Sequence, residues 1–169
     1  RDDVFATAAV GYRFFTIDPS EYVVNAADDM SESELNEGIA RLVEDAVLPG
    51  NWESFYLDRA FETDGAGDLR FSRETLYRAA VKYSRAIHYA ESMAGWIAEA
   101  NGERDYEIEV SVDETDSPTA AIEHLFFALE LKRRRVSVVS LAPRFIGRFE
   151  KGVDYKGDLG EFESSLKEH

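Results

Sequence analysis

The feature that most constrains the fold is a strand–helix–strand pattern over residues 106–151. Residues 106–112 read Tyr-Glu-Ile-Glu-Val-Ser-Val, with apolar side chains at alternate positions, and residues 136–141 read Val-Ser-Val-Val-Ser-Leu. A helical pattern over residues 119–131 separates the two runs. Two strands joined by a helix of this length are typical of a parallel pair with a crossover connection. We therefore predict a βαβ unit within an α/β fold.

Charged residues follow both predicted strands. Asp113 and Glu114 come directly after the first strand, and Arg144 comes soon after the second, ahead of Lys151. In parallel α/β folds the C-terminal ends of the strands carry the chemistry. A carboxylate there can act as a general base or bind a divalent metal, whereas an arginine offers a planar fork to a carboxylate or diol. These four side chains are therefore candidates for an active site.

The carboxylates after the first strand also have a structural explanation. Asp113, Asp116 or Ser117 could cap the next helix, with Pro118 near its first turn. The residues alone favour neither the catalytic nor the capping explanation of Asp113. Capping and catalysis can also coexist on different residues.

Two further candidates have competing explanations of the same kind. His124 could bind a metal, but it lies on the second apolar stripe of its helix, where a packed histidine or a subunit contact is favoured. Lys151 lies between Glu150 and Asp154, so ion pairing explains it without a ligand. A helix that is apolar on two sides is usually buried on two sides. We therefore expect a second copy of the chain, in a homo-oligomer, or further chain to cover it.

The rest of the chain predicts one more strand and several helices. Residues 11–17, Gly-Tyr-Arg-Phe-Phe-Thr-Ile, form a strand pattern, and residues 18–105 predict a helical connection to the next strand. Within that connection, Ser31-Glu-Ser-Glu34 resembles a capping box, and a long helix should run from Ser72 to Asn101-Gly102.

The C-terminal part, residues 106–169, carries the motifs and ends in a helix that begins near Asp158. Between the βαβ helix and its second strand, the three arginines 133–135 predict a solvated turn. Together, residues 1–169 are expected to form a single incomplete α/β domain, part of either a barrel or an open doubly wound sheet.

Composition excludes several classes of function. The formal charge is −15, from 34 acidic and 19 basic residues, so nucleic acid is a poor partner. Cysteine is absent, which excludes disulfides and thiolate metal sites and makes the cytoplasm the expected compartment. No apolar run is long enough to cross a membrane. Because the chain does not begin with Met and stops within a predicted helix, we expect it to be an internal fragment of a longer protein.

Several segments together resemble the tagaturonate epimerase family. The motif-bearing resemblance covers residues 106–169, with weaker support before it. Members of this family are much longer, so the resemblance places the chain in the middle of such an enzyme and implies that the fragment alone is inactive. The segments are Phe14-Phe-Thr-Ile-Asp-Pro19, Val112-Asp-Glu-Thr, Pro118-Thr, Glu123-His124, Ala142-Pro-Arg-Phe, Phe149-Glu-Lys-Gly-Val-Asp-Tyr155 and Gly157-Asp158.

The resemblance implies a metal-dependent sugar-acid epimerase on a (β/α) TIM-like barrel, interconverting tagaturonate and fructuronate in hexuronate catabolism. The inverted carbon is not adjacent to the keto carbon, so retro-aldol cleavage and re-addition, or transient oxidation, is needed. A divalent metal ion would stabilise the enolate of the retro-aldol route. The resemblance assigns Asp113 as acid/base and Glu114 as a metal or supporting group, with exchangeable roles. It leaves His124 as a second metal candidate, and Arg144 and Lys151 as candidates for binding the substrate.

Two other classes of function stay open at this stage. A related metal-dependent aldolase or sugar isomerase would share the scaffold and the enolate step. A non-catalytic acidic binding domain would have kept the scaffold without the chemistry. A capped, ion-paired segment after the first βαβ strand would favour the non-catalytic class.

Overall fold

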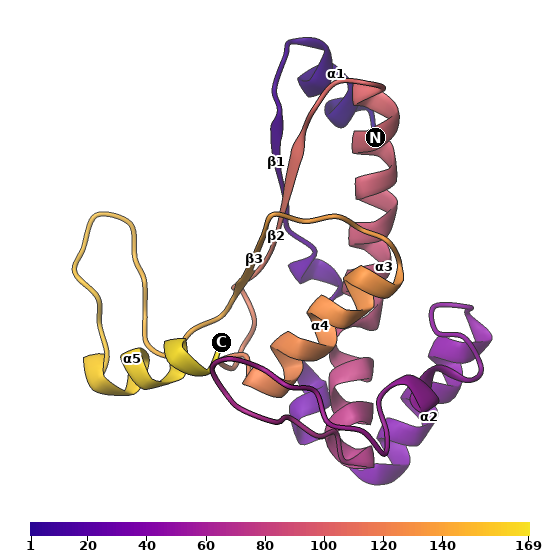
Figure 1. The fold of residues 1–169 in the computed structure, drawn as a ribbon, viewed down its shortest axis with the longest axis vertical. Helices are drawn as coiled ribbons and strands as arrows, with labels where there is room; N and C mark the ends of the chain where they lie inside the picture. Colours follow the sequence, from indigo (N-terminus) through magenta and orange to yellow (C-terminus); the bar gives the residue numbers. More distant parts are fainter.

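The computed structural model describes all 169 residues and contains one three-stranded sheet (Figure 1). The strands are β1 (Phe14–Ile17), β2 (Glu107–Val112) and β3 (Ser140–Pro143), and they lie in the same order in space as along the chain. Both pairs are parallel, with Ile17 opposite Val110 and Val112 opposite Pro143. The prediction of three parallel strands in one sheet is confirmed.

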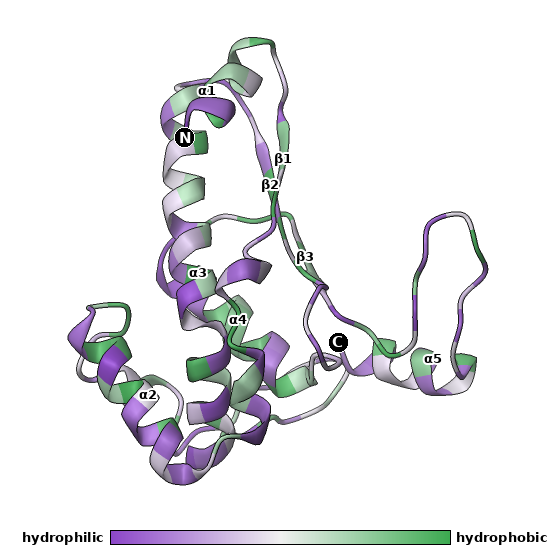
Figure 2. Ribbon diagram, turned by 180° about the vertical axis from the view of Figure 1, so that it is seen from behind, coloured by the Kyte–Doolittle hydropathy of each residue, from purple (hydrophilic) through white to green (hydrophobic).

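The helices α3 and α4, which connect the strands, lie on the same side of the sheet (Figures 1 and 2). α3 runs along most of the body, and α4 packs against it. None of the helices combines the length and the apolar composition that crossing a membrane requires. The helical elements are α1 (Asp2–Ala9), η1 (Ser20–Tyr22), η2 (Asn25–Asp29), α2 (Glu32–Glu44), η3 (Trp52–Phe55), α3 (Arg73–Asn101), α4 (Ala121–Arg133) and α5 (Leu159–Glu168).

Local signals in the sequence set the start of α2 and both ends of α3. At the start of α2, the Ser31 hydroxyl accepts a hydrogen bond from the Glu34 backbone N–H, and the Glu34 carboxylate accepts one from the Ser31 N–H. α3 begins after Ser72 and ends at Gly102, whose φ of +60° suits glycine. These predicted boundaries are confirmed.

The two faces of the sheet differ in polarity. Alternate side chains of β1 and β2, including Ile17, Ile108 and Val110, are buried in the core between the sheet and the helices. The other face carries polar residues, where the Thr16 hydroxyl donates to the Glu109 carboxylate at 3.1 Å. Alternation of this kind is expected of a sheet that one layer of helices covers.

Two strands are shorter than predicted. β3 starts only at Ser140. The residues before it end α4 instead, because Arg135 has a φ of +60° and the Val136 N–H donates to the Leu131 carbonyl. The first part of residues 11–17 forms a turn at Gly11, with a φ of +98°, after α1. The sequence reading missed α1.

The prediction that arginines 133–135 form a solvated turn is wrong for Arg133 and Arg134, which pair with buried or partly buried carboxylates. Glu130 is fully buried, and its carboxylate accepts hydrogen bonds from Arg133 at 2.6 and 2.8 Å and from the Tyr56 hydroxyl at 2.5 Å. The Arg134 side chain is only 8% exposed and also pairs with Glu91 at 2.6 Å. Burial raises the pKa of Glu130, but the bonds from Arg133 and Tyr56 outweigh it and lower that pKa overall.

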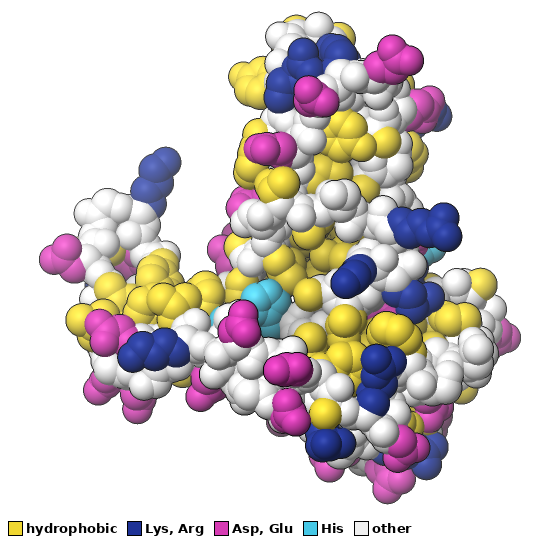
Figure 3. Space-filling model, viewed as in Figure 1, with side chains coloured by type: hydrophobic (Ala, Val, Ile, Leu, Met, Phe, Trp, Pro, Cys, Tyr) yellow, Lys and Arg dark blue, Asp and Glu magenta, His cyan; other side chains and the backbone are white.

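Residues 145–169, the C-terminal arm, stand away from the body in two opposite views (Figures 1 and 2). Figure 3 shows apolar side chains gathered on the arm. They include Phe149, Tyr155 and Phe162, whose ring centroids lie 5.1–5.3 Å apart. Asp158 caps α5 by accepting the Glu161 N–H, which confirms the predicted start of the last helix.

Candidate functional site

The candidate site lies where β2 and β3 end. Because Val112 lies opposite Pro143, Asp113 and Arg144 leave neighbouring strands at the same level. Residues 113–120, here called the strand-end loop, are bonded to the end of β3. The Thr119 N–H donates to the Arg144 carbonyl at 2.8 Å, and the Arg144 N–H donates to the Thr119 hydroxyl at 3.1 Å. The structure thus places Asp113 and Arg144, two of the predicted site residues, at neighbouring strand ends.

Both carboxylates at the start of the strand-end loop are exposed to solvent. The Ser111 hydroxyl donates to the Asp113 carboxylate at 2.5 Å, whereas Glu114 makes no side-chain hydrogen bond. Asp113 follows Ser111 by two residues and so continues the polar face of the sheet. Neither carboxylate is ion-paired, so both are available to a ligand.

The capping explanation of Asp113 is wrong. α4 begins after Ala120, which has no side-chain oxygen, and the Glu123 carboxylate accepts the Ala120 N–H at 2.8 Å instead. Asp116 and Ser117 do not cap the helix either. The Asp116 N–H donates to the Asn25 side chain, and the Ser117 hydroxyl forms a side-chain hydrogen bond within the body.

A buried group of charges lies beneath the strand-end loop, and the sequence reading missed it. The Lys82 ammonium donates to both oxygens of Asp28 at 2.8 and 2.9 Å, and to Ser117 and Glu123 at 3.1 Å. Burial lowers the pKa of Lys82, but its bond to Asp28 and the charge of Glu123 raise it overall. A lysine flanked by apolar residues within a helical pattern, Ala79-Ala-Val-Lys-Tyr83, was the sequence signal that could have revealed this group.

His124 packs against the last residue of the chain. Its Nδ1 lies 2.9 Å from Nδ1 of His169, whose ring is edge-on to Phe145. Burial, and then the charge of His169, lower the pKa of His124 to about 4. Figure 3 shows histidine side chains where the C-terminal arm meets the body. The favoured explanation, a packed histidine, agrees with this geometry.

The residues of this chain do not by themselves fit a metal ion. Glu114 and His124 belong to no group of three or more histidine, aspartate or glutamate side chains able to hold one. Nδ1 of His124 already faces another imidazole, so that nitrogen is not free to coordinate. These 169 residues therefore do not bring three such ligands together, and the assignment of Glu114 and His124 as metal ligands stays a prediction.

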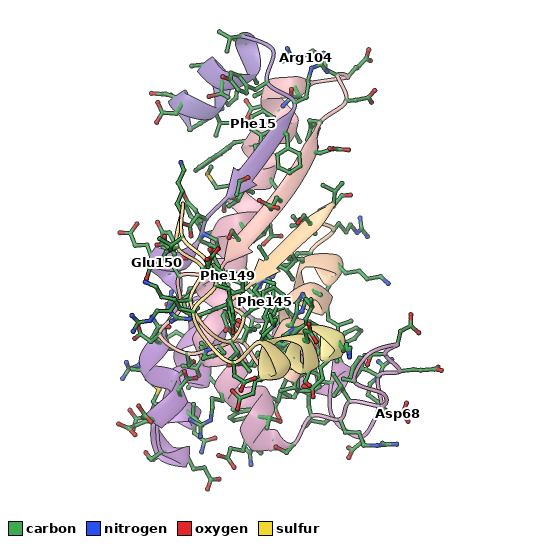
Figure 4. All side chains as sticks on the ribbon, turned by 90° about the vertical axis from the view of Figure 1, so that its left-hand side faces the viewer. Phe15, Asp68, Arg104, Phe145, Phe149 and Glu150 are labelled. Atoms are coloured by element: carbon green, nitrogen blue, oxygen red, sulfur yellow. The ribbon has the colours of Figure 1, made fainter.

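The structure does not bring Lys151 to the strand-end loop. Lys151 is exposed and follows Phe149 and Glu150, which are labelled in Figure 4, in the loop of the C-terminal arm. The ion pair expected for it with Glu150 is made instead by Lys156, at 3.1 Å. Of the two predicted substrate-binding residues, only Arg144 lies at the strand ends.

Known proteins resemble the whole of this chain. The family described as tagaturonate epimerase matches residues 1–169. A Thermotoga maritima protein named tagaturonate/fructuronate epimerase is 37% identical over 168 residues, which is 99% of this chain and 33% of that protein. Native and glycerol-bound crystal structures of a fructuronate-tagaturonate epimerase from Cohnella laeviribosi superpose with a TM-score of 0.85 at 35% identity. They cover 98% of this chain, which spans about a third of the length of these relatives.

Proposed function

This chain belongs to the tagaturonate epimerase family, and from that premise we propose that it contributes to an enzyme that interconverts tagaturonate and fructuronate. The observation that carries the proposal is the match over all 169 residues, combined with an exposed, unpaired Asp113 at the end of β2. The substrate would be a small sugar acid. The expected cytoplasmic setting stays a prediction.

A TIM-like barrel is the scaffold that we propose for the complete protein. The strands follow one another in order β1-β2-β3, and both connecting helices lie on one face of the sheet. A barrel has its helices on the outside only, whereas a doubly wound sheet has helices on both faces. The polar face carrying Glu109 and Ser111 would then line the barrel interior and lead to Asp113.

The chemistry that we propose for this segment is proton transfer and binding of the substrate. Retro-aldol cleavage begins when a base removes the proton of the hydroxyl at the carbon to be inverted. The bond to the neighbouring carbon then breaks, leaving an aldehyde and an enolate. After the aldehyde turns its other face, the bond reforms and the proton returns. Asp113 is our candidate for holding that proton, because its carboxylate is free except for Ser111.

Two other side chains have supporting roles in this proposal. Arg144 lies one strand away from Asp113, where its guanidinium would bind the substrate carboxylate as a fork. Glu114 could exchange roles with Asp113 or offer a carboxylate to a divalent metal ion. A bound metal would supply electrophilic stabilisation of the enolate oxygen. Other parts of the complete protein would have to contribute the remaining ligands.

Product analysis of the complete natural protein tests this function. We expect tagaturonate incubated with the enzyme to yield fructuronate, and the reverse, when followed by NMR spectroscopy. A related aldolase would instead release the two three-carbon fragments. Release of those fragments without the epimer, or no turnover with any divalent metal ion added, would contradict the proposal.

A further inference from the structure

The most completely enclosed charge near the site is the Lys82 ammonium on α3. Its side chain is 1% exposed, and its partners come from η2, the strand-end loop and α4. The Tyr83 ring lies 5.4 Å away on the same helix. Because Lys82 is closed off from solvent, it cannot contact a substrate. Any effect that it has on the reaction must act through its partners.

Those partners are the groups that hold the strand-end loop in place. The Ser117 hydroxyl donates to Asp28 at 2.6 Å, and the second oxygen of Glu123 accepts the Ala120 N–H at 2.8 Å. Lys82 lies between these two carboxylates and forms an ion pair with each, so its one positive charge offsets one of the two negative charges. Without its charge, two acids would face each other in a poorly solvated place. The loop would then lose its connection to α3.

We propose that Lys82 is a positioning residue: it holds the strand-end loop so that Asp113 and Glu114 project from the end of β2. The loop is fixed at Ser117 and Ala120, while its first two residues stay exposed. The consequence for catalysis rests on the proposed function. The role of Lys82 in holding the loop does not depend on the proposed function, and it can be measured separately.

The chain contains a matched control for a purely structural effect. Arg134 is also a buried cation, 8% exposed, and it bonds to Glu91 and Glu130. None of its bonds reaches the strand-end loop. Loss of either cation should destabilise the fold, because each is buried and removes one ion pair from a carboxylate that is itself largely buried, Glu123 or Glu130. Only loss of Lys82 should release the loop.

The experiment compares Lys82→Met, Arg134→Met and Ser117→Ala in the complete natural protein. Backbone amide hydrogen exchange of residues 113–117 reports on the loop, and kcat and KM for epimerisation are measured separately. We expect Lys82→Met to speed loop exchange by at least about tenfold and to lower kcat more than it raises KM. Ser117→Ala removes the hydroxyl that donates to Asp28 and accepts from Lys82, and it leaves the ion pairs of Lys82 in place. It should therefore change loop exchange and kcat in the same direction as Lys82→Met, with little change in melting temperature.

Arg134→Met should leave loop exchange and kcat near the wild-type values even where its melting temperature falls. Equal loosening of the loop by Arg134→Met and Lys82→Met would overturn the proposal, as would unchanged exchange and kcat in Ser117→Ala. If Lys82→Met does not fold, Ser117→Ala decides alone. An inactive wild-type protein would overturn the proposed function, whereas the exchange measurements would still decide the role of Lys82.

Discussion

At the scale of single residues, the strand-end loop separates side chains that are held from side chains that are free. Thr115 and Thr119 are buried, and Ser117 bonds to the charges beneath the loop. Asp113 and Glu114, in contrast, are exposed. A rigid loop that presents unpaired carboxylates meets the requirement that catalytic groups be positioned before substrate arrives.

Replacing Asp113 by asparagine should remove activity without unfolding the protein. Loss of a general base typically lowers turnover by about 10²–10⁴-fold. The side chain is exposed and caps no helix, and the Ser111 hydroxyl could still donate to the asparagine carbonyl. The measurements are tagaturonate turnover with saturating divalent metal ion and the melting temperature, both on the complete natural protein.

Asp116→Asn is the matched control, because Asp116 is exposed in the same loop and only its backbone N–H is engaged. This variant should keep wild-type turnover. Unchanged turnover in Asp113→Asn would rule out its catalytic role. A large fall in melting temperature would show that Asp113 is structural instead.

Acid should destabilise the fold through His124. Its pKa is about 4 in the folded protein, against 6.5 in the unfolded chain, so the unfolded chain binds the proton more readily. This contribution to stability is fully present above pH 6.5 and is lost as the pH falls towards 4. The loss should be on the order of 1–3 kcal/mol. His169 faces the ring directly, and the same cavity is lined by Asp64, Lys167 and Glu168.

Urea unfolding at several pH values between 7.5 and 4 measures this effect. His124→Gln should flatten the dependence, whereas His88→Gln, on an exposed part of α3, should leave it unchanged. Identical slopes for wild type and His124→Gln would exclude His124 as the source. Carboxylates that titrate in the same range cancel in the comparison.

At the scale of elements, the C-terminal arm depends on glycines as much as on its aromatic cluster. Gly147 has a φ of +90° and packs against the Tyr155 ring, whose hydroxyl donates to the Ile146 carbonyl at 3.1 Å. A Cβ at position 147 would overlap that ring. The arm therefore needs both an unusual backbone angle and the absence of a side chain at this one position.

Gly147→Ala should loosen the arm while the body stays folded. We expect limited proteolysis to cleave residues 147–158 at least about tenfold faster than in wild type, with the core helices α3 and α4 protected. Gly152→Ala is the control, because its φ is +81° but no atom lies within 4 Å of the added carbon. It should show only the backbone strain, about 1 kcal/mol. Equal cleavage of both variants would show that the contact with Tyr155 contributes nothing.

At the scale of the whole molecule, this chain exposes strand edges, one face of its sheet and several large apolar side chains. β1 and β3 each have an unpaired edge, and the sheet has helices on one face only. Phe149, Leu159 and Leu166 on the arm are 47–61% exposed. Exposed strand edges and apolar patches of this kind promote association.

The 169-residue chain produced alone should therefore self-associate. Sedimentation velocity should show species larger than a monomer, and Phe149→Glu with Leu166→Glu should shift the distribution towards monomer. Val43→Glu, at an exposed position of α2, is the control and should not change the distribution. A stable monomer over a wide concentration range would contradict this expectation.

The sequence by itself determined the features that depend on near neighbours. Alternation in residues 107–112 gave the buried face of β2, and Ser31, Ser72 and Gly102 marked helix ends. The parallel sheet followed from the βαβ spacing, which also put Asp113 and Arg144 at adjacent strand ends. Periodicity and capping act within about four residues, so a linear pattern records them.

Only the tertiary structure decided which charges meet. Lys82 and its partners Asp28 and Glu123 are 54 and 41 positions apart, and Glu130 is 74 positions from Tyr56. His124 and its neighbour are 45 positions apart. No local rule sets such pairs, because they depend on how α3 and α4 pack together and where the loops between them lie. The start of α4 shows the same limit at short range. The sequence offered Asp113, Asp116 and Ser117 as caps, but Ser117 bonds to the buried charges instead, and the Glu123 carboxylate accepts the Ala120 N–H.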